Sequence, residues 1–227
     1  MTASWVGASV RGEAHRRLGD SNQDAWAGRS GSFGSVVVVA DGMGSRAEAK
    51  RSAEAACQAV LTSVRVAGSN PPSAPALLRL VDAVWLLIVA DAAPADVGST
   101  CLLSWQRPDG SILLAQVGDG LCCFVGAGMR VSTDSASDGW LNQTESIGSG
   151  RWHYEEVRPA SPGSVLLATD GVAADLREEL IPELVGAVAG RLRPLSRTKA
   201  WRELASDLRA WPTPGSGDDR TMVVHLL

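Results

Sequence analysis

The chain has 227 residues, of which 45% are hydrophobic and 20% are charged, and its formal net charge is −4. This length and balance suit one folded domain over residues 1–227 and argue against disorder. The acidic charge and the lack of a basic stripe argue against nucleic acid as a partner. The apolar run 83–90 is far shorter than the roughly 20 residues of a membrane span, so no membrane partner is expected.

Strand-like and helix-like patterns follow one another along the chain. The β-branched run 35–40, bounded by glycines, is typical of a buried central strand. Small apolar residues then recur every three or four positions over 46–66, which predicts a helix with one apolar face. Strands are expected at 4–11, 24–29, 35–40, 99–106, 111–117, 121–125, 129–132, 152–157, 165–169 and 221–227, and helices at 46–66, 75–92, 173–191 and 198–211.

The order of these elements indicates the fold class. Strands come first, then two helices, a run of hairpin-linked strands, two more helices and a last strand. Such grouped runs favour an α+β fold over alternating βαβ units. We therefore expect antiparallel sheets with pairs of helices packed on their outer faces.

Four cysteines occur in apolar runs, without the spacing of a zinc site or a disulfide framework: Cys57, Cys101, Cys122 and Cys123. They are interpreted as buried, reduced thiols, which indicates a reducing compartment. The N-terminus shows no secretory leader pattern. The expected location is the cytoplasm.

Acidic residues stand at the ends of several predicted strands. They are Asp24, Asp41, Asp170 and the neighbouring Asp218 and Asp219. A carboxylate at the mouth of a buried strand is costly unless a positive charge compensates it. Carboxylate, carbonyl and water oxygens are the ligands that Mg²⁺ and Mn²⁺ prefer, and two such ions would activate a water and clamp a phosphoryl group.

Glycines follow two of these aspartates, and this pattern has two interpretations. Gly42 and Gly171 would let an ion or ligand approach the backbone. Asp-Gly is also a common turn dipeptide, and Asp109-Gly110 is interpreted as a turn. The coincidence of several strand-end aspartates favours the metal interpretation.

Six short motifs occur in a fixed order. They are Asn22-Gln23-Asp24, Asp41-Gly42-Met43-Gly44, Gly98-Ser99-Thr100, Gly118-Asp119-Gly120, Thr169-Asp170-Gly171 and Asp219-Arg220-Thr221. Together they resemble the metal-dependent protein serine/threonine phosphatase family of type 2C, from about residue 9 to the C-terminus. Each motif is weak by itself, whereas six in order are specific. The segment 12–17 resembles a compact bacterial branch of that family.

The resemblance implies a fold, an activity and cofactors. The fold would be a central sandwich of two antiparallel β-sheets flanked by pairs of antiparallel helices, in four α-β-β-α layers. The activity would be hydrolysis of phosphoserine and phosphothreonine in proteins, by a water held between two Mn²⁺ or Mg²⁺ ions. Phosphorylated proteins would be the substrates, and a serine/threonine kinase with its targets a partner.

It also implies roles for individual residues. Asp41 would bridge the two metal ions, and Gly42 would lend its backbone carbonyl. Asp170 and Asp219 would complete the shell of one ion, while Asp24 would hold a metal-bound water. These residues form the predicted metal site, with Asp41 and Asp24 also counted as catalytic.

A third, weaker metal ion is the most open of these expectations. Asp96, just before Gly98-Ser99-Thr100, resembles its ligand, and the alternative is an ordinary exposed loop aspartate. Asp119 matches a position for which a structural role is expected.

Three positions depart from the family pattern. Gly19 stands where many members carry a phosphate-gripping arginine, so Arg16 or Arg17 is expected to bind the phosphate, the alternative being a solvated surface pair. Met43 cannot act as the general acid that a histidine provides in some members. Arg220 stands where asparagine is usual, which would alter hydrogen bonds to the preceding aspartate.

Two other functions are considered. A pseudophosphatase would bind phosphoproteins or scaffold a kinase partner without efficient turnover, and the departures at Gly19 and Arg220 motivate this alternative. An aspartyl-phosphate hydrolase would use Asp41 as a covalent nucleophile, but Met43 occupies the position of its acid/base.

The remaining candidates are assigned structural or peripheral roles. His15, His153 and His225 are isolated from any nucleophile motif, and His225 is expected to be a packed or edge residue. The polar region 133–163, which contains Trp140 and Trp152, corresponds to the part of the family that varies and contacts targets.

Overall fold

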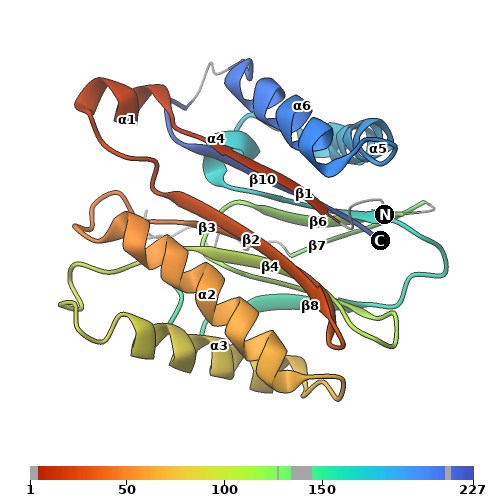
Figure 1. Cartoon of the computed structure of the whole chain (residues 1–227), viewed down its shortest axis with the longest axis horizontal. Helices are drawn as coiled ribbons and strands as arrows, with labels where there is room; N and C mark the ends of the chain where they lie inside the picture. Colours follow the sequence, from red (N-terminus) through yellow and green to blue (C-terminus); the bar gives the residue numbers. More distant parts are fainter. Residues whose placement is uncertain (1–4, 127, 134–144, 213–215) are drawn as a thin grey trace.

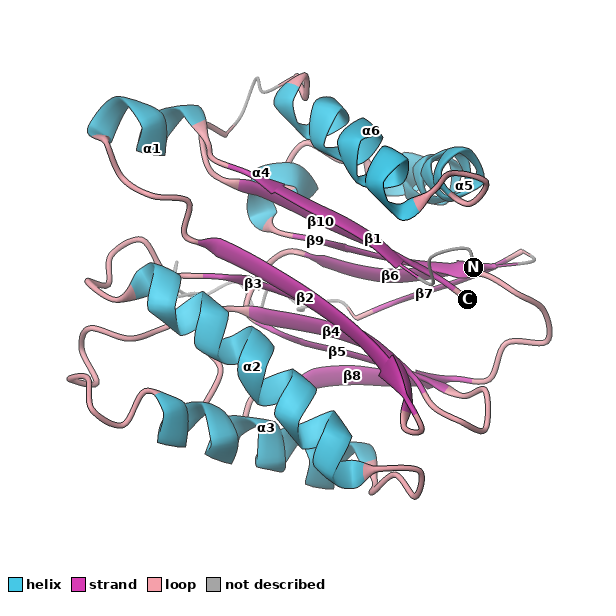
Figure 2. Ribbon diagram, in the orientation of Figure 1, coloured by secondary structure: helices cyan, strands magenta, loops and turns pink. Residues whose placement is uncertain are grey.

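The computed structural model describes residues 5–126, 128–133, 145–212 and 216–227. Two five-stranded antiparallel sheets stack on each other, and helices cover their outer faces in four layers (Figures 1 and 2). One sheet has the order β1 (Trp5–Val10), β10 (Arg220–Leu226), β9 (Ser164–Ala168), β6 (Leu121–Gly126) and β7 (Met129–Ser132). The other has the order β2 (Asp24–Gly31), β3 (Gly34–Asp41), β4 (Cys101–Gln106), β5 (Ile112–Val117) and β8 (His153–Val157). The α+β sandwich expected from the sequence is confirmed.

Helix pairs form the two outer layers. The sheet containing β3 is covered by α2 (Ala49–Ala67) and α3 (Ala74–Ile88), and the sheet containing β10 by α5 (Ile181–Leu192) and α6 (Arg197–Arg209). Short helices lie at the loops: α1 (Glu13–Leu18), α4 (Asp170–Ala173) and the 3-10 turn η1 (Glu178–Leu180). Among the described residues, no helix is long and apolar enough to cross a membrane.

The valine run of β3 shows why its sequence is continuously apolar. Val36 and Val38 pack beneath α2 and α3, whereas Val37 and Val39 face the opposite sheet. Successive side chains of a strand point to opposite faces, so a strand covered on both sides needs apolar residues at every position. Asp41 is the last residue of β3 and follows this buried run directly, so it lies at the mouth of the sandwich.

The region 170–192 differs from the single helix predicted over 173–191. It forms α4, then η1, then α5, with Pro182 in the first turn of α5. Proline lacks the N–H that a helix interior requires but fits the first turn, so the chain stops and restarts there. The short α1 was not predicted, because six residues carry too little periodicity to identify a helix.

His225 links the two sheets across the interior of the sandwich. Its Nε2 lies 2.8 Å from the Ser35 hydroxyl of β3, and its Nδ1 lies 3.0 Å from the Ser104 hydroxyl of β4. Burial lowers the pKa of His225 to about 3. It is thus a packed residue of a central strand, and the imidazole stays neutral at physiological pH.

We expect acid to destabilise the wild-type protein more than the His225→Gln variant, which retains hydrogen-bonding groups but cannot ionise. In the unfolded chain His225 binds a proton below its ordinary pKa of 6.5. In the folded chain the same imidazole stays unprotonated down to about pH 3. Stability is therefore lost as pH falls through this window, by up to about 1.4 kcal/mol per pH unit. Urea unfolding of both proteins across this range measures the difference, and parallel pH profiles would contradict the assignment.

Candidate metal centre

The carboxylates predicted to hold metal ions come from both sheets. Asp24 begins β2 and Asp41 ends β3, and their Cα atoms are direct partners in the antiparallel ladder. Asp170 begins α4 directly after β9, and the pair Asp218 and Asp219 directly precedes β10. The topology thus gathers carboxylates that lie up to 195 residues apart in sequence, since 219 − 24 = 195.

Burial and mutual repulsion disfavour the ionised forms of these groups. Burial raises the pKa of Asp41 to about 10, with added repulsion from Asp24, Asp170, Asp218 and Asp119. Burial also raises the pKa of Asp24 to about 7, although hydrogen bonds from Thr221 and Thr169 oppose this shift. The pKa of Asp170 is raised by burial and then by Asp119 and Asp218.

One oxygen of the Asp170 carboxyl group lacks a donor within the described part of the protein. Oδ1 of Asp170 is buried without a hydrogen-bond partner among the described residues. A buried oxygen without a donor and carboxyls with raised pKa values both fit divalent cations, which would replace the missing positive charge.

The backbone of Asp41 is fixed from the neighbouring strand region. Its N–H donates to the Thr100 hydroxyl at 3.0 Å, and its carbonyl accepts from the Ser99 hydroxyl and the Thr100 N–H, both at 2.8 Å. Thr169 similarly donates its hydroxyl to Asp24 Oδ2 at 2.9 Å. These neutral hydroxyls orient the carboxylates without supplying the charge that would neutralise them.

The two glycines that follow aspartates make room for protein backbone. A Cβ atom at Gly42 would lie 2.1 Å from the carbonyl oxygen of Ala49, and one at Gly171 would lie 2.0 Å from the carbonyl oxygen of Asp219. A glycine is therefore required at each position for close chain packing. Close packing is thus a second reason for glycine at both positions, and the approach of an ion or ligand to this backbone stays a prediction.

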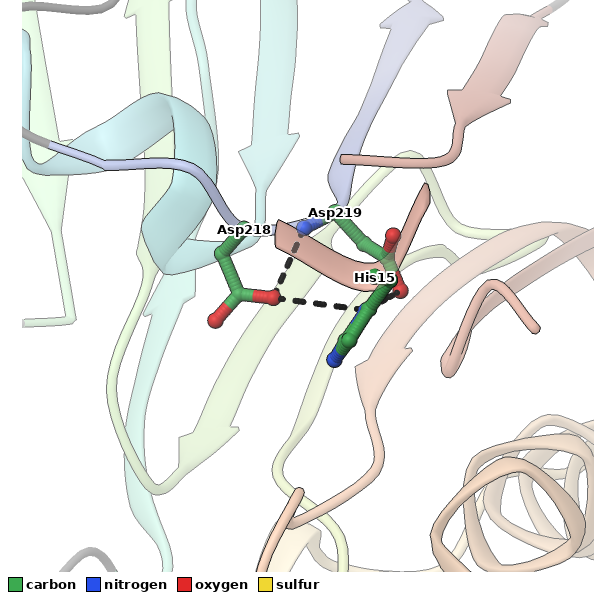
Figure 3. A group of neighbouring side chains, drawn as sticks. All are labelled: His15, Asp218 and Asp219. Atoms are coloured by element: carbon green, nitrogen blue, oxygen red, sulfur yellow. Dashed lines mark hydrogen bonds and ion pairs between the residues drawn. The ribbon is translucent and has the colours of Figure 1, made fainter. Parts of the chain in front are cut away.

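The adjacent Asp218 and Asp219 differ in direction and partners (Figure 3). Asp219 is 2% exposed and accepts hydrogen bonds from Gly12 N–H and Gln23 N–H, both at 2.6 Å, and its Oδ2 lies 2.8 Å from His15 Nδ1. Asp218 is 45% exposed and raises the pKa of Asp41 and Asp170. Asp218 thus acts on Asp41 and Asp170, whereas Asp219 raises the pKa of Asp24 and ties the loops before α1 and β2 to β10. His15, Asp218 and Asp219 each place one possible ligand atom within 4.8 Å of the others.

Two further aspartates, Asp96 and Asp119, bear on the expected third ion. The described contacts of Asp96 are in its backbone, which accepts from Glu48 N–H and donates to the Ala93 carbonyl, as in a turn. Asp119, expected to be structural, raises the pKa of both Asp41 and Asp170. Asp119 is therefore the carboxylate that joins the group.

The basic residues near the site lie on α1. Arg16 pairs with Glu13 at 3.3 Å and Arg17 with the same carboxylate at 3.1 Å, and their side chains are 49% and 77% exposed. Gly19, which replaces the expected arginine, ends α1 with φ +80. Since a side chain at that backbone angle is strained, the position is needed to terminate the helix.

The side chain of Arg220 is directed toward α6. Its Nη1 reaches the Leu208 carbonyl at the end of α6, and the side chain is buried. Alternate residues of a strand point to opposite faces, so Arg220 faces the helix layer. The described hydrogen bond of Arg220 is thus made to α6, and its expected effect on the hydrogen bonds of Asp219 stays a prediction.

The start of the variable region 133–163 is only partly described, because residues 134–144, including Trp140, lie outside the described residues. Its second part is tied to the site through Ile147 N–H, which donates to the Ser99 carbonyl at 2.9 Å. Asp82 of α3 accepts from Gly148 N–H at 2.8 Å and from the Trp152 indole at 3.0 Å. Trp152 therefore anchors this loop.

The sequence analysis named Asp218 among the strand-end carboxylates but gave the ligand role to Asp219, and it expected a structural role for Asp119. The sequence held one signal for Asp218. Successive residues along a strand point to opposite faces, so only one of two neighbouring aspartates can face the other carboxylates. Asp119 carried the same Asp-Gly pattern as Asp41 and Asp170. Neither pattern fixes the direction of the side chain, which depends on the turn each residue occupies.

Comparison with known proteins identifies the family. A family model described as Protein phosphatase 2C matches residues 11–211. Among solved structures, the serine/threonine phosphatase Stp1 from Staphylococcus aureus has a TM-score of 0.67 at 16% identity, covering 100% of this chain and 95% of its own. The PPM Ser-Thr phosphatase MsPP from Mycobacterium smegmatis, in complex with cacodylate, has a TM-score of 0.64 at 20% identity, covering 100% and 99%.

A third structure, the catalytic domain of the serine threonine protein phosphatase PstP in complex with 2 manganese ions, has a TM-score of 0.60 at 18% identity, covering 97% of this chain and 96% of its own. No curated protein matches the sequence significantly. The structural likeness supports the fold, while the family model spans most of the chain and includes five of the six motifs together with α1 to α6. The chain therefore belongs to the protein phosphatase 2C family.

Proposed function

We propose that this protein phosphatase hydrolyses phosphoserine and phosphothreonine in proteins, with a water activated between two divalent cations. The observation that carries the proposal is the group of buried carboxylates with raised pKa values, contributed by both sheets at one mouth of the sandwich. A protein has no reason to bury so many acids unless cations offset their charge.

The residues that would hold the cations are Asp41, Asp170 and Asp218, with the Gly42 carbonyl. Asp41 interacts with both other carboxylates, which suits a bridging ligand. Asp24, fixed by Thr169, would accept a hydrogen bond from a water beside Asp41. When bound, Mn²⁺ or Mg²⁺ would lower the pKa of a water and offset the charge of the phosphate. A third, weaker ion would be held at Asp119, in place of Asp96.

Substrate phosphate would be bound by the guanidinium groups of α1. Arg16 and Arg17 share one exposed carboxylate partner, Glu13. Exposed pairs of this kind are worth at most about 1 kcal/mol, so a phosphate dianion would compete for either arginine. The proposed catalytic set is Asp41, Asp24 and these two arginines.

The test is hydrolysis of a phosphothreonine peptide by the wild-type protein, with Mn²⁺ and after chelation with EDTA. We expect turnover that requires the metal, and a melting temperature that rises with Mn²⁺ because the cation binds only the folded site. Arg16 and Arg17 are each replaced by alanine, and we expect KM to rise several-fold in the variant that lacks the phosphate-binding arginine. Arg209→Ala on α6 serves as the matched control. Equal activity with and without metal would contradict the two-cation mechanism.

Two outcomes would favour the alternatives. Binding of the phosphopeptide by metal-loaded protein without turnover would indicate a pseudophosphatase, for which Gly19 in place of an arginine is the supporting observation. Trapping of a phosphorylated enzyme would indicate an aspartyl-phosphate mechanism at Asp41. Neither is expected, because the carboxylate group is complete and Met43 offers no acid.

The proposed partners are phosphorylated proteins and a serine/threonine kinase that modifies them. The proposed location is the cytoplasm. It is supported by the four cysteines, which are buried and not joined in disulfides. Such thiols persist in a reducing compartment.

A further inference from the structure

A groove runs across the edge at which the two sheets stack. β1 and β2 are the edge strands of their sheets and lie side by side there (Figure 1). A cavity of about 250 Å³ opens at this edge, with an aromatic lining of Trp5, Trp26 and Trp201. A second cavity of about 460 Å³ continues from Trp26 toward α2. We refer to both together as the tryptophan groove.

Two tryptophans form the floor of this groove by packing on glycines of the opposite strand. A Cβ atom at Gly7 would lie 2.6 Å from the Trp26 ring, and one at Gly28 would lie 2.4 Å from the Trp5 ring. Each indole therefore rests on bare backbone of the other sheet. This reciprocal packing fixes both rings in place, and Trp5 is only 8% exposed.

The wall of the groove belongs to the first two turns of α6. The Arg197 guanidinium lies over the Trp5 ring, 5.1 Å from its centroid. Trp201, one turn later, is 46% exposed. An indole and a stacked guanidinium on the rim of a cavity are the groups that most often anchor a bound peptide.

The charged side chains beside the groove are mostly cationic. Arg197 lies on α6, Arg29 on β2 and Arg65 on α2, and all three are exposed. Within the described ranges none of the three forms a salt bridge, whereas Arg191 on α5 is paired with acids. Glu54 is the one acid among the lining residues. On a chain of net charge −4, this basic groove favours an acidic ligand.

The strands offer a second means of binding. Over the described residues, β1 pairs only with β10, and β2 only with β3, so each has an unpaired edge. An unpaired edge presents N–H and C=O groups to an extended chain. The ligand that fits is therefore an extended peptide.

We propose that the tryptophan groove binds an extended acidic peptide segment of a protein partner, with one aromatic side chain seated among Trp5, Trp26 and Trp201. The acidic residues of that segment would pair with Arg197, Arg29 and Arg65. None of the groove residues is one of the carboxylates of the metal centre, so this docking does not rest on turnover.

The probe is a fluorescein-labelled heptapeptide of aspartate and glutamate with a central tryptophan, titrated with the full chain by fluorescence anisotropy. Its controls are the same peptide with central alanine and a lysine peptide with central tryptophan. We expect Trp201→Ala and Arg197→Ala each to weaken binding about tenfold, as truncation of interface anchors does. Arg209→Ala, at the far end of the same helix, should change it less than about twofold.

Trp201 and Arg197 are exposed, and unchanged circular dichroism and melting temperature would verify that the variants fold. Arg65→Glu, on the α2 side of the groove, should also weaken the acidic probe and strengthen the lysine peptide. Equal binding of both charged peptides, or an equal effect of Arg209→Ala, would overturn the proposal. Self-association that Trp201→Ala abolishes would assign the groove to a second copy of the chain and also overturn it.

Discussion

Asp41→Asn is expected to lower phosphatase activity by about a thousandfold or more while raising the stability of the metal-free protein. The loss of activity follows because the proposed bridging ligand of both cations is removed. The gain follows because burial and four neighbouring carboxylates raise the pKa of Asp41. In the unfolded metal-free chain, the Asp41 carboxyl ionises freely above pH 3.8. In the folded chain it must keep its proton or lose hydration on ionising, and either costs free energy of folding that asparagine does not.

The pH dependence of the unfolding free energy tests the direction of this stability change. A raised folded pKa contributes stability that is present at low pH and is lost as pH rises, so Asp41→Asn should gain more at about pH 7.5 than at about pH 4. Urea unfolding in EDTA measures the gain, and Mn²⁺ titration by melting temperature should show that the variant is no longer stabilised. Asp91→Asn, an exposed aspartate on the surface, should change neither activity nor metal binding. A metal-free Asp41→Asn protein less stable than wild type would contradict the account.

Asp218→Ala and Asp219→Ala are expected to fail in different ways. Asp218→Ala should lose about a hundredfold or more of metal-dependent activity while it remains folded, because its exposed carboxylate accepts only the Asp219 N–H as a described hydrogen bond. Asp219→Ala should lose about 3 kcal/mol or more of unfolding free energy. The reason is that Gly12 N–H and Gln23 N–H would be left without their acceptor.

Urea unfolding, together with Mn²⁺ affinity by calorimetry, separates these two effects. Asp219→Asn serves as the matched variant, since its amide oxygen still accepts a hydrogen bond, and it should recover part of the stability. His15→Gln should cost less stability than Asp219→Ala, because it removes one of three partners. If Asp219→Ala folded with wild-type stability but lost its metal affinity, the sequence-based assignment of Asp219 as a ligand would be restored.

The sequence by itself determined the fold class and the family. The apolar run of β3 and the three- and four-residue periodicity of α2 depend only on which faces are buried, and this information is local. The motif order around Asp24, Asp41 and Asp170 similarly indicated the family and the general location of the site. Strands that end in aspartates could be identified without knowledge of the strands that pair with them.

The tertiary structure decided which atoms meet. Whether Asp218 or Asp219 faces Asp41 depends on donors from the loop before α1, more than 200 residues away in sequence. The close approach of Ala49 to Gly42 likewise comes from the placement of α2. The tryptophan groove requires residues of β1, β2 and α6 to meet at one edge. Such contacts follow from the packing of distant segments, and local periodicity carries no record of that packing.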